Sequence, residues 1–327
     1  MLKKIRVVPL AAESFGVRSM CTYVETPDLR ILLDAGVSLC PNRFGLPPHP
    51  KEFEAIIQCR RKISEAAEKA EVVTISHYHY DHHTPSFEDW LVNWTQANET
   101  ARQIYEDKTV LLKNPREKVN YSQRERGWLF ARTGGKCAAK ISNADGQTFV
   151  FGETKLKFSE PVFHGHENSE MGWILMVTIS FEGEKFMFAP DIQGPMSIRP
   201  LEIILQEYPQ LLMIGGPPLY LSPSRVSESQ IDASLANLDR IVQQTSHVIL
   251  DHHILRDEEW QQKIVKPLYE SYRSGSTLQT AAEYAGENNC FLEAGRKKLF
   301  QENPPSKEFE AWMKLSEEKR KFKKPPI

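Results

Sequence analysis

Four histidines and one aspartate crowd into a short stretch that directly follows an apolar run. Residues 72–87 read "VVTISHYHYDHHTPSF", and the potential ligands in them are His77, His79, Asp81, His82 and His83. Imidazoles and a carboxylate suit zinc and other borderline divalent metals. Without a metal, imidazoles this close would lose solvation and would repel one another when protonated. The motif therefore predicts a metal site.

The spacing of the ligands indicates how the chain presents them. His77, His79 and Asp81 lie two residues apart, and an extended backbone would point all three side chains to one face. His82 and His83 follow in a turn. We expect His83 to pack behind the ligands. The alternative is a substrate-facing role, in which it donates a proton to the leaving group, because the pKa of histidine suits that task.

Further ligand types follow later apolar runs, at points where strands are expected to end. These are His164 and His166 after "SEPVF", Asp191 after "FMFAP", and His252 and His253 after "HVIL". Open α/β sheets collect their sites at the carboxyl ends of strands. Any one of these residues alone could be a cap or a turn residue, but their joint occurrence points to one metal centre.

The elements that must position these residues are predicted from apolar periodicity. Short strands are expected near 5–10, 21–26, 30–36 and 71–76, and a helix is expected over 51–70. Strand character returns at 147–163, 172–191, 211–216 and 247–253, with a helix over 229–245. This order of β-rich and α/β stretches predicts two sheets covered by helices.

Two segments depart from this pattern within a predicted single domain of residues 1–302. Residues 88–140 are expected to form a mostly helical, locally basic insertion. It is either a solvated face or a cap that reaches over the site through Arg124, Arg126 or Arg132. The charged tail at 303–327 is expected to be a frayed helix or a mobile terminus.

Bulk properties limit the classes of protein that the chain can belong to. It has 327 residues, of which 40% are hydrophobic and 26% charged, as is typical of a globular protein with a substantial core. A net charge of -2 gives no support to a protein that wraps nucleic acid. Five scattered cysteines without a CxxC pair predict a cytoplasmic setting. No signal peptide and no apolar run near the ~20 residues of a membrane span is evident.

On these residues the sequence resembles the metallo-β-lactamase-fold hydrolases. The likeness rests on "LDAG" at 33–36, "HYHYDH" at 77–82, His164, Asp191 and His252, and it covers about residues 5–255. It implies an α/β (α+β) fold, a four-layer αβ/βα sandwich of two mixed β-sheets flanked by helices. "ISHYHYDHHTP", "NYSQRERGW", "IGGPPLYL" and "LDHHILRD" resemble an uncharacterised, mainly archaeal branch, from which no activity can be carried over.

The resemblance implies two adjacent divalent ions, with Zn²⁺ favoured and Fe or Mn as alternatives. The implied ligands are His77, His79 and His164 for the first ion, Asp81, His82 and His252 for the second, and Asp191 between them. His166 could replace His164, and His253 could replace His252. Asp81 would also orient the nucleophile and accept its proton.

The activity implied is hydrolysis of an ester or phosphoester in a small or phosphorylated substrate. "DHHTPSF" replaces the D-H-x-x-G of many relatives, which argues against an ordinary glyoxalase II or lactonase. The alternatives are a nuclease or phosphodiesterase acting on nucleic acid, a mononuclear iron dioxygenase, and a metal-bound protein without catalysis. No membrane partner is expected, and the oligomeric state stays open.

Several residues are candidates for the substrate pocket. Gly215 and Gly216 could bring backbone N–H groups to an anionic substrate, or they could simply form a tight turn. Tyr220 and Arg225 are further candidates. Just past the last ligand, Arg256 and Asp257 are candidates for a supporting salt bridge.

Overall fold

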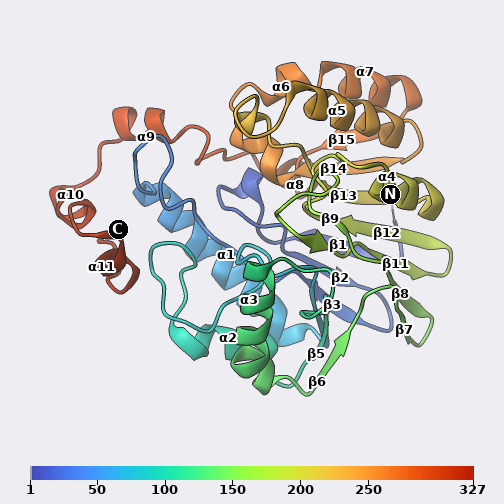
Figure 1. Cartoon of the computed structure of the whole chain (residues 1–327), viewed down its shortest axis with the longest axis horizontal. Coiled ribbons are helices and arrows are strands. Elements are labelled where there is room, and N and C mark those ends of the chain that lie inside the picture. The colour runs from blue at the N-terminus through green and yellow to red at the C-terminus, as the bar shows by residue number, and fades with distance from the viewer. Residues whose placement is uncertain (1) are drawn as a thin grey trace.

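Two β-sheets are stacked at the centre of the molecule, in a computed structural model that describes residues 2–327 (Figure 1). The first sheet has, in spatial order, β1 (Arg6–Pro9), β2 (Thr22–Glu25), β3 (Arg30–Leu33), β4 (Val72–Ile75), β5 (Thr109–Leu112) and β6 (Lys140–Asn143). The second has β15 (Thr277–Gln279), β14 (His247–Asp251), β13 (Leu211–Gly215), β12 (Glu184–Ala189), β11 (Val177–Phe181), β8 (Thr154–Phe158) and β7 (Thr148–Phe151). A separate two-stranded ribbon pairs β9 (Val162–Phe163) with β10 (Trp173–Ile174).

Both sheets are mixed, as the sequence predicts. In the first, β1, β2 and β3 form an antiparallel meander, while β3 to β6 pair in parallel. In the second, β12 to β15 pair in parallel. The pairs β7–β8, β8–β11 and β11–β12 of the same sheet are antiparallel. The parallel strands of each sheet therefore direct their carboxyl ends toward one edge.

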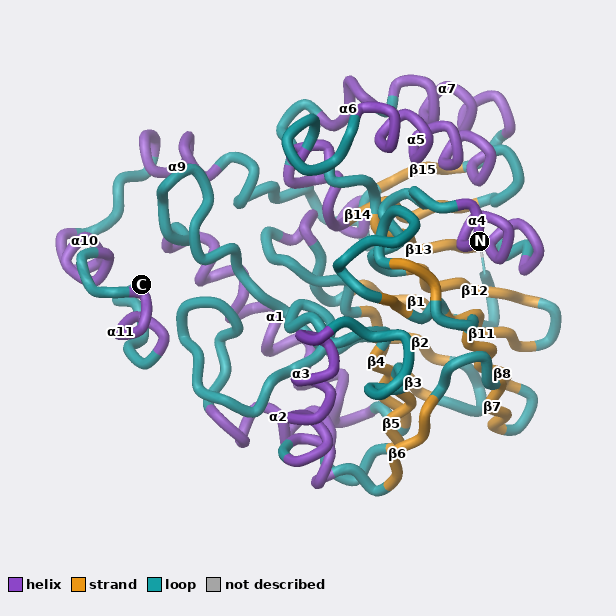
Figure 2. Tube along the Cα trace, viewed as in Figure 1, coloured by secondary structure: helices purple, strands orange, loops and turns teal. Residues whose placement is uncertain are grey.

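Helices cover the outer face of each sheet (Figures 1 and 2). On the side of the first sheet lie α1 (Pro50–Lys69), α2 (Ala97–Tyr105) and α3 (Tyr121–Arg132), and on the side of the second lie α4 (Ile198–Glu207), α5 (Glu228–Val242) and α7 (Val265–Ser274). The shorter helices are η1 (Glu13–Phe15), η2 (Gly134–Cys137), η3 (Leu219–Leu221), η4 (His252–Arg256), α6 (Trp260–Lys263), α8 (Ala281–Tyr284), α9 (Arg296–Glu302), α10 (Lys307–Met313) and α11 (Glu317–Lys321).

Three apolar cores hold these layers together. Between the sheets, Leu33 of β3 packs in one cluster with Phe188 of β12 and Ile249 of β14. A second cluster joins the outer face of the first sheet to α1, and a third joins the outer face of the second sheet to α4 and α5. This is the four-layer αβ/βα sandwich of the metallo-β-lactamase fold, which confirms the predicted architecture.

The sequence of α1 explains why the helix forms at the predicted place. Phe53, Ile56 and Ile63 recur at helical spacing and are fully buried. At the N-terminus, the side chain of Glu52 accepts a hydrogen bond from the backbone N–H of His49, and the His49 ring accepts one from Lys51. This reciprocal capping, with Pro50 at the first helical position, fixes the start of the helix.

The predicted insertion at 88–140 is only partly helical. It contains α2, α3 and η2, but β5 lies in the middle of it and pairs in parallel with β4 and β6. Helix α2 therefore connects two neighbouring strands of the sheet. The prediction missed β5 because its four residues, "TVLL", are too short to show a period.

The prediction of a frayed or mobile tail is wrong. Phe309 and Trp312 of α10 are buried, and their rings lie 6.1 and 5.6 Å from that of Phe53 in α1. Just before the tail, Arg296 of α9 is buried and pairs with Glu52, with 2.7 Å between Nη2 and Oε1. The charged composition of the tail hid Phe309 and Trp312, whose partner Phe53 lies far earlier in the chain.

Among residues 2–327, no helix combines the length and the apolar character that crossing a lipid bilayer requires.

Replacing Trp312 tests whether the tail is part of the folded core. We expect Trp312→Ala to lower the free energy of unfolding by about 3–5 kcal/mol, because a buried aromatic ring is lost from the contact with α1. Phe322→Ala is the matched control, since Phe322 is 66% exposed and should change stability by less than about 0.5 kcal/mol. Equal urea unfolding curves for both variants would contradict the packed tail.

Candidate metal centre

The predicted ligands come together where strands of both sheets end. Ser76 and His77 follow β4, His164 follows β9, Asp191 lies two residues past β12, and His252 directly follows β14. The ends of β4, β12 and β14 thus meet at the carboxyl edge of the stacked sheets. The structure brings together all seven residues that the resemblance implied, together with His253.

The carboxylate of Asp191 lies at the centre of the cluster. Its Oδ2 atom is 2.9 Å from Nε2 of His164 and 3.2 Å from Nε2 of both His77 and His82. Nδ1 of His79 lies 3.1 Å from Nε2 of His77 and 4.0 Å from the same carboxylate oxygen. One oxygen of Asp191 therefore borders the imidazoles that follow β4 and β9.

The other oxygen of Asp191 faces the end of β14. Its Oδ1 atom is 2.9 Å from Nε2 of His252 and 3.3 Å from Nε2 of His253. His252 Nε2 in turn lies 3.7 Å from Asp81 Oδ2 and 3.4 Å from His82 Nε2. Potential ligand atoms that all lie within 4.8 Å of one another form His/Asp groups, and Asp191 belongs to two of them, one with His77, His79 and His164 and one with His252 and His253. Asp81, His82 and His252 form a further group beside it.

The ring nitrogens that point away from the cluster have partners of their own. Nδ1 of His77 lies 2.9 Å from Ser76 Oγ, and Nδ1 of His82 lies 2.9 Å from Asp34 Oδ2. Nδ1 of His252 lies 3.2 Å from Glu13 Oε2. Such outer partners fix the ring orientation and leave the inner nitrogen free to bind a metal.

Two polar atoms inside the cluster test whether it fits a metal. His164 Nε2 and Asp191 Oδ1 are buried and make no hydrogen bond, although each lies close to other polar atoms of the cluster. Leaving a buried polar atom without a partner destabilises a protein, so such atoms mark a missing ligand. Imidazole nitrogens and carboxylate oxygens within 4.8 Å of one another form a donor set for zinc, iron or manganese. The residues therefore fit divalent metal ions.

The electrostatics of the cluster favour metal-binding protonation states for some of its members. Burial and the neighbouring His164 together lower the pKa of His79 to about 3, so the ring is neutral. Although burial opposes it, His252, His164 and His82 hold the pKa of Asp191 well below its usual value. Burial opposes a charge on His252 as well, but Asp191 and Glu13 raise its pKa to about 9. A metal would replace that proton.

The backbone at the centre adopts conformations that most residues avoid. Asp34, Asp191 and His252 have φ values of 46°, 41° and 68°, all in the left-handed region. Non-glycine residues in this region store strain that the surrounding structure must offset, and they concentrate at functional sites.

The two alternative ligands behave differently. His166 belongs to none of the His/Asp groups, and its Nδ1 atom lies 2.9 Å from the carbonyl oxygen of Glu167. His253 forms a group with Asp191 and His252, and its Nδ1 atom lies 3.3 Å from the hydroxyl of Tyr220. The structure thus places His164 rather than His166 in the cluster, and it adds His253 beside His252.

His83 lies among aromatic rings and outside the His/Asp groups. Its ring centroid is 5.7 Å from that of Tyr78 and 5.1 Å from that of Tyr80, and its Nδ1 atom lies 3.0 Å from the carbonyl oxygen of His79. Burial lowers its pKa to about 3. A neutral, packed ring fits the expectation that His83 supports the ligand loop from behind.

The glycine pair serves close packing. A Cβ atom on Gly215 would lie 2.9 Å from the backbone nitrogen of Asp191, and one on Gly216 would lie 2.6 Å from Cβ of Ile254. The N–H of Gly216 already donates to the carbonyl oxygen of Asp251. This N–H is therefore not free for a substrate anion, and the prediction of such a contact is wrong for Gly216.

The other pocket candidates are spread around the site. Arg256 and Asp257 are candidates for a salt bridge in the sequence, but in the structure Arg256 pairs with the buried Glu13 instead. The Nη2 atom of Arg256 lies 3.9 Å from Asp81 Oδ2. The hydroxyl of Tyr220 accepts from Arg256 Nη1 at 3.2 Å. The side chain of Arg225 is exposed.

The arginines of α3 divide between its two faces. Arg126 donates from Nη1 to the carbonyl oxygen of Tyr78 at 3.2 Å, and its guanidinium lies over the Tyr80 ring. Arg124 and Arg132 point to solvent. Only Arg126 therefore contacts the loop that carries the motif.

Sequence reasoning missed the residues that hold the ligands from outside. Asp34 accepts hydrogen bonds from the N–H and the hydroxyl of Ser76 as well as facing His82. Its place in "LDAG" was a usable signal. Glu13 lies in η1 and meets His252 from 239 positions earlier, and nothing in its local sequence marks it.

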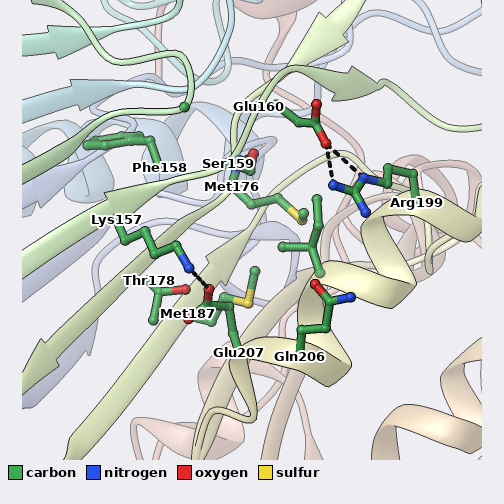
Figure 3. Close-up of a pocket in the computed structure, with 12 residues that line it drawn as sticks. Lys157, Phe158, Ser159, Glu160, Met176, Thr178, Met187, Arg199, Gln206 and Glu207 are labelled. Atoms are coloured by element: carbon green, nitrogen blue, oxygen red, sulfur yellow. Dashed lines mark hydrogen bonds and ion pairs between the residues drawn. The ribbon is translucent and has the colours of Figure 1, made fainter.

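A pocket of about 240 Å³ lies away from this cluster, between the outer face of the second sheet and α4 (Figure 3). Lys157 pairs with Glu207, and Arg199 pairs with Glu160, across its rim. These charges pair with one another, and among residues 2–327 none of the residues that line this pocket belongs to a candidate metal-binding group.

Comparison with known proteins identifies the family. The chain is 42% identical over 295 residues to the UPF0282 protein of Methanopyrus kandleri, covering 90% of this chain and 99% of that protein. It is 41% identical over 298 residues to the UPF0282 protein of Methanocaldococcus jannaschii, covering 91% and 97%. The chain belongs to the UPF0282 family. No model in a scan of protein families matches it.

Solved structures share the fold of this UPF0282 protein at low sequence identity. Unliganded yeast PDE1 superposes with a TM-score of 0.51 and 10% identity, covering 85% of this chain and 97% of that one. The metallo-β-lactamase fold protein YhfI of Bacillus subtilis gives a TM-score of 0.48 and 12% identity, covering 85% and 96%. At such identity the likeness concerns the fold alone.

Metal content tests the assignment of the ligands. We expect His79→Ala to lose bound metal, because His79 forms one group of potential ligands with His77, His164 and Asp191. His166→Ala is the matched control and should keep the metal content of the unaltered protein, since His166 belongs to none of the groups of His and Asp side chains that could hold a metal. Elemental analysis of both purified proteins decides the point, and full retention of metal by His79→Ala would refute the assignment.

Gly36 provides a second test, which concerns the packing behind the ligands. A Cβ atom at this position would meet the backbone nitrogens of His82 and His83 far inside contact distance. We expect Gly36→Ala to lower stability by roughly 1–3 kcal/mol and metal affinity about 10- to 100-fold, because the ligand loop must shift. Gly295→Ala, whose new Cβ would make only ordinary contacts, is the control. An unchanged metal affinity for Gly36→Ala would show that the loop tolerates displacement.

Proposed function

We propose that this UPF0282 protein is a metal-dependent hydrolase of ester or phosphoester bonds, with a centre for two divalent ions. The observation that carries the proposal is Asp191, whose Oδ2 atom borders His77, His82 and His164 and whose Oδ1 atom borders His252 and His253. His77, His79 and His164 would hold one ion, and Asp81, His82 and His252 would hold the other. Zn²⁺ suits this donor set, as do Fe and Mn.

The open side of the cluster supports access by a substrate. The side chains of His79, Asp81 and His253 are 18%, 16% and 11% exposed, whereas the remaining ligands are 0–1% exposed. A substrate can therefore approach past His79 and Asp81 while the rest of the centre stays dry. A dry site strengthens the electrostatic interactions made within it.

Asp81 would act as the base. Two divalent ions, when bound, would polarise the scissile group and lower the pKa of the attacking water. Although burial opposes it, the neighbouring His82 and His252 lower the pKa of Asp81, so its carboxylate is ionised. On the open side of the centre, this carboxylate can orient the water and accept its proton.

Arg256 and Tyr220 are placed to support the reacting groups. Arg256 is buried against Glu13, within 3.9 Å of Asp81, and the Tyr220 hydroxyl reaches both Arg256 and His253. Arg256 thereby holds Asp81 and the Glu13–His252 pair in place.

All five cysteines are free, which fits the reducing cytoplasm that we propose as the setting.

A substrate panel tests the proposal. We expect the protein loaded with Zn²⁺ or Mn²⁺ to hydrolyse at least one generic phosphodiester, phosphomonoester, lactone or thioester. Asp81→Asn should lower kcat by at least about 10²-fold, because it removes both the proposed base and a proposed metal ligand. Asp257→Asn, outside the His/Asp groups, is the control and should leave kcat unchanged. A single iron per chain with oxygen uptake and no hydrolysis would overturn the proposal.

A further inference from the structure

The outer face of α3 exposes aromatic and basic side chains in one row. Tyr121 is 82% exposed and Trp128 is 55% exposed, and Arg124 and Arg132 are exposed beside them. Positions 121, 128 and 132 recur at helical spacing, so their side chains line up along the axis. The guanidinium of Arg132 lies over the Trp128 ring, 4.4 Å from its centroid. We name these four residues the α3 row.

Positive charge is concentrated around this row. Residues 116–140 contain seven Lys or Arg and two Glu, a net charge of +5, so the rest of the chain carries −7 within a total of −2. Glu125 is the one acidic residue among the exposed side chains of α3. The near-neutral total therefore hides a local basic surface, which attracts polyanions.

Helix α3 is fixed beside the open side of the metal centre. Arg126, on its inner side, donates to the carbonyl oxygen of Tyr78 and lies over Tyr80, and these two tyrosines flank His79. Gln123 bonds both the N–H and the carbonyl oxygen of Trp173 in β10, the partner of the strand that precedes His164. The inner side of α3 therefore contacts the loop that carries His79, and the α3 row lies on the outer face of the same helix.

We propose that the α3 row binds single-stranded nucleic acid and directs the strand toward the metal centre. Exposed aromatic rings stack on unpaired bases, and arginines between them contact the phosphates. Tyr121 and Trp128 lie seven residues apart, about 10 Å along the helix, so they can stack on different bases of one strand. The directing role rests on the proposed hydrolase function, whereas the binding does not.

The composition of the row favours a single strand over the other polyanionic partners. In a duplex the bases are stacked on one another, and their faces are not open to Tyr121 and Trp128. A helix that lies in a membrane surface buries a broad apolar face. The exposed side chains of α3 include no aliphatic residue larger than Ala131.

Binding of a fluorescein-labelled oligothymidylate or oligouridylate, measured by fluorescence anisotropy, tests the proposal. We expect Trp128→Ala to raise Kd roughly 5- to 150-fold, the loss of one stacked base. Arg132→Ala should reduce the slope of log Kd against log salt by about one. Tyr272→Ala is the matched control, because Tyr272 is 85% exposed on α7, a helix of the other sheet, and its Kd should not change.

Three results would overturn the proposal. These are no binding of either oligonucleotide at low salt, an equal effect of Trp128→Ala and Tyr272→Ala, and binding of anionic phospholipid vesicles in place of oligonucleotides. The binding assay uses Asp81→Asn as background, so that hydrolysis does not consume the probe, and hydrolysis of small esters is measured separately on the unaltered protein. Failure to bind while small esters are hydrolysed would refute only the α3 row, and tight binding without any hydrolysis would refute only the hydrolase.

Discussion

A single buried carboxylate, Asp191, organises the centre of this protein. It is 1% exposed and lies within 4.0 Å of a nitrogen from each of six histidines. A buried charge is tolerated only where it is paired or binds a metal. Two sheets must deliver the imidazoles to this one oxygen pair, which is why the ligands follow strands of both sheets and why several backbones there are strained.

Two acidic residues, Asp34 and Glu13, fix the orientation of histidine rings in the cluster. Asp34 fixes Ser76 and His82, and Glu13 fixes His252 and Arg256. These contacts connect η1 to the end of β14 and hold the loop of residues 77–83 against Asp34. The same rigidity places α3, through Arg126, beside the open side of the centre. The geometry of the His/Asp cluster and the position of α3 therefore depend on one network of contacts.

The sequence predicts what is local and periodic. The motif at 77–83, the helix at 51–70 and the strands before each ligand have signals within a few residues, and the two-sheet architecture follows from their order. Glu13, Phe309 and Trp312 have no such signal, because their roles depend on partners more than 200 positions away. The choice of His164 over His166 also required the fold, since both follow the same strand.

The central claim, that Asp191 separates two metal ions, is tested most directly by anomalous diffraction from crystals of the metal-loaded protein. The account predicts two anomalous peaks, one beside His77, His79 and His164 and one beside Asp81, His82 and His252, with the Asp191 carboxylate between them. A single peak on the first group, with Asp81 and His252 outside contact distance of any ion, would contradict it.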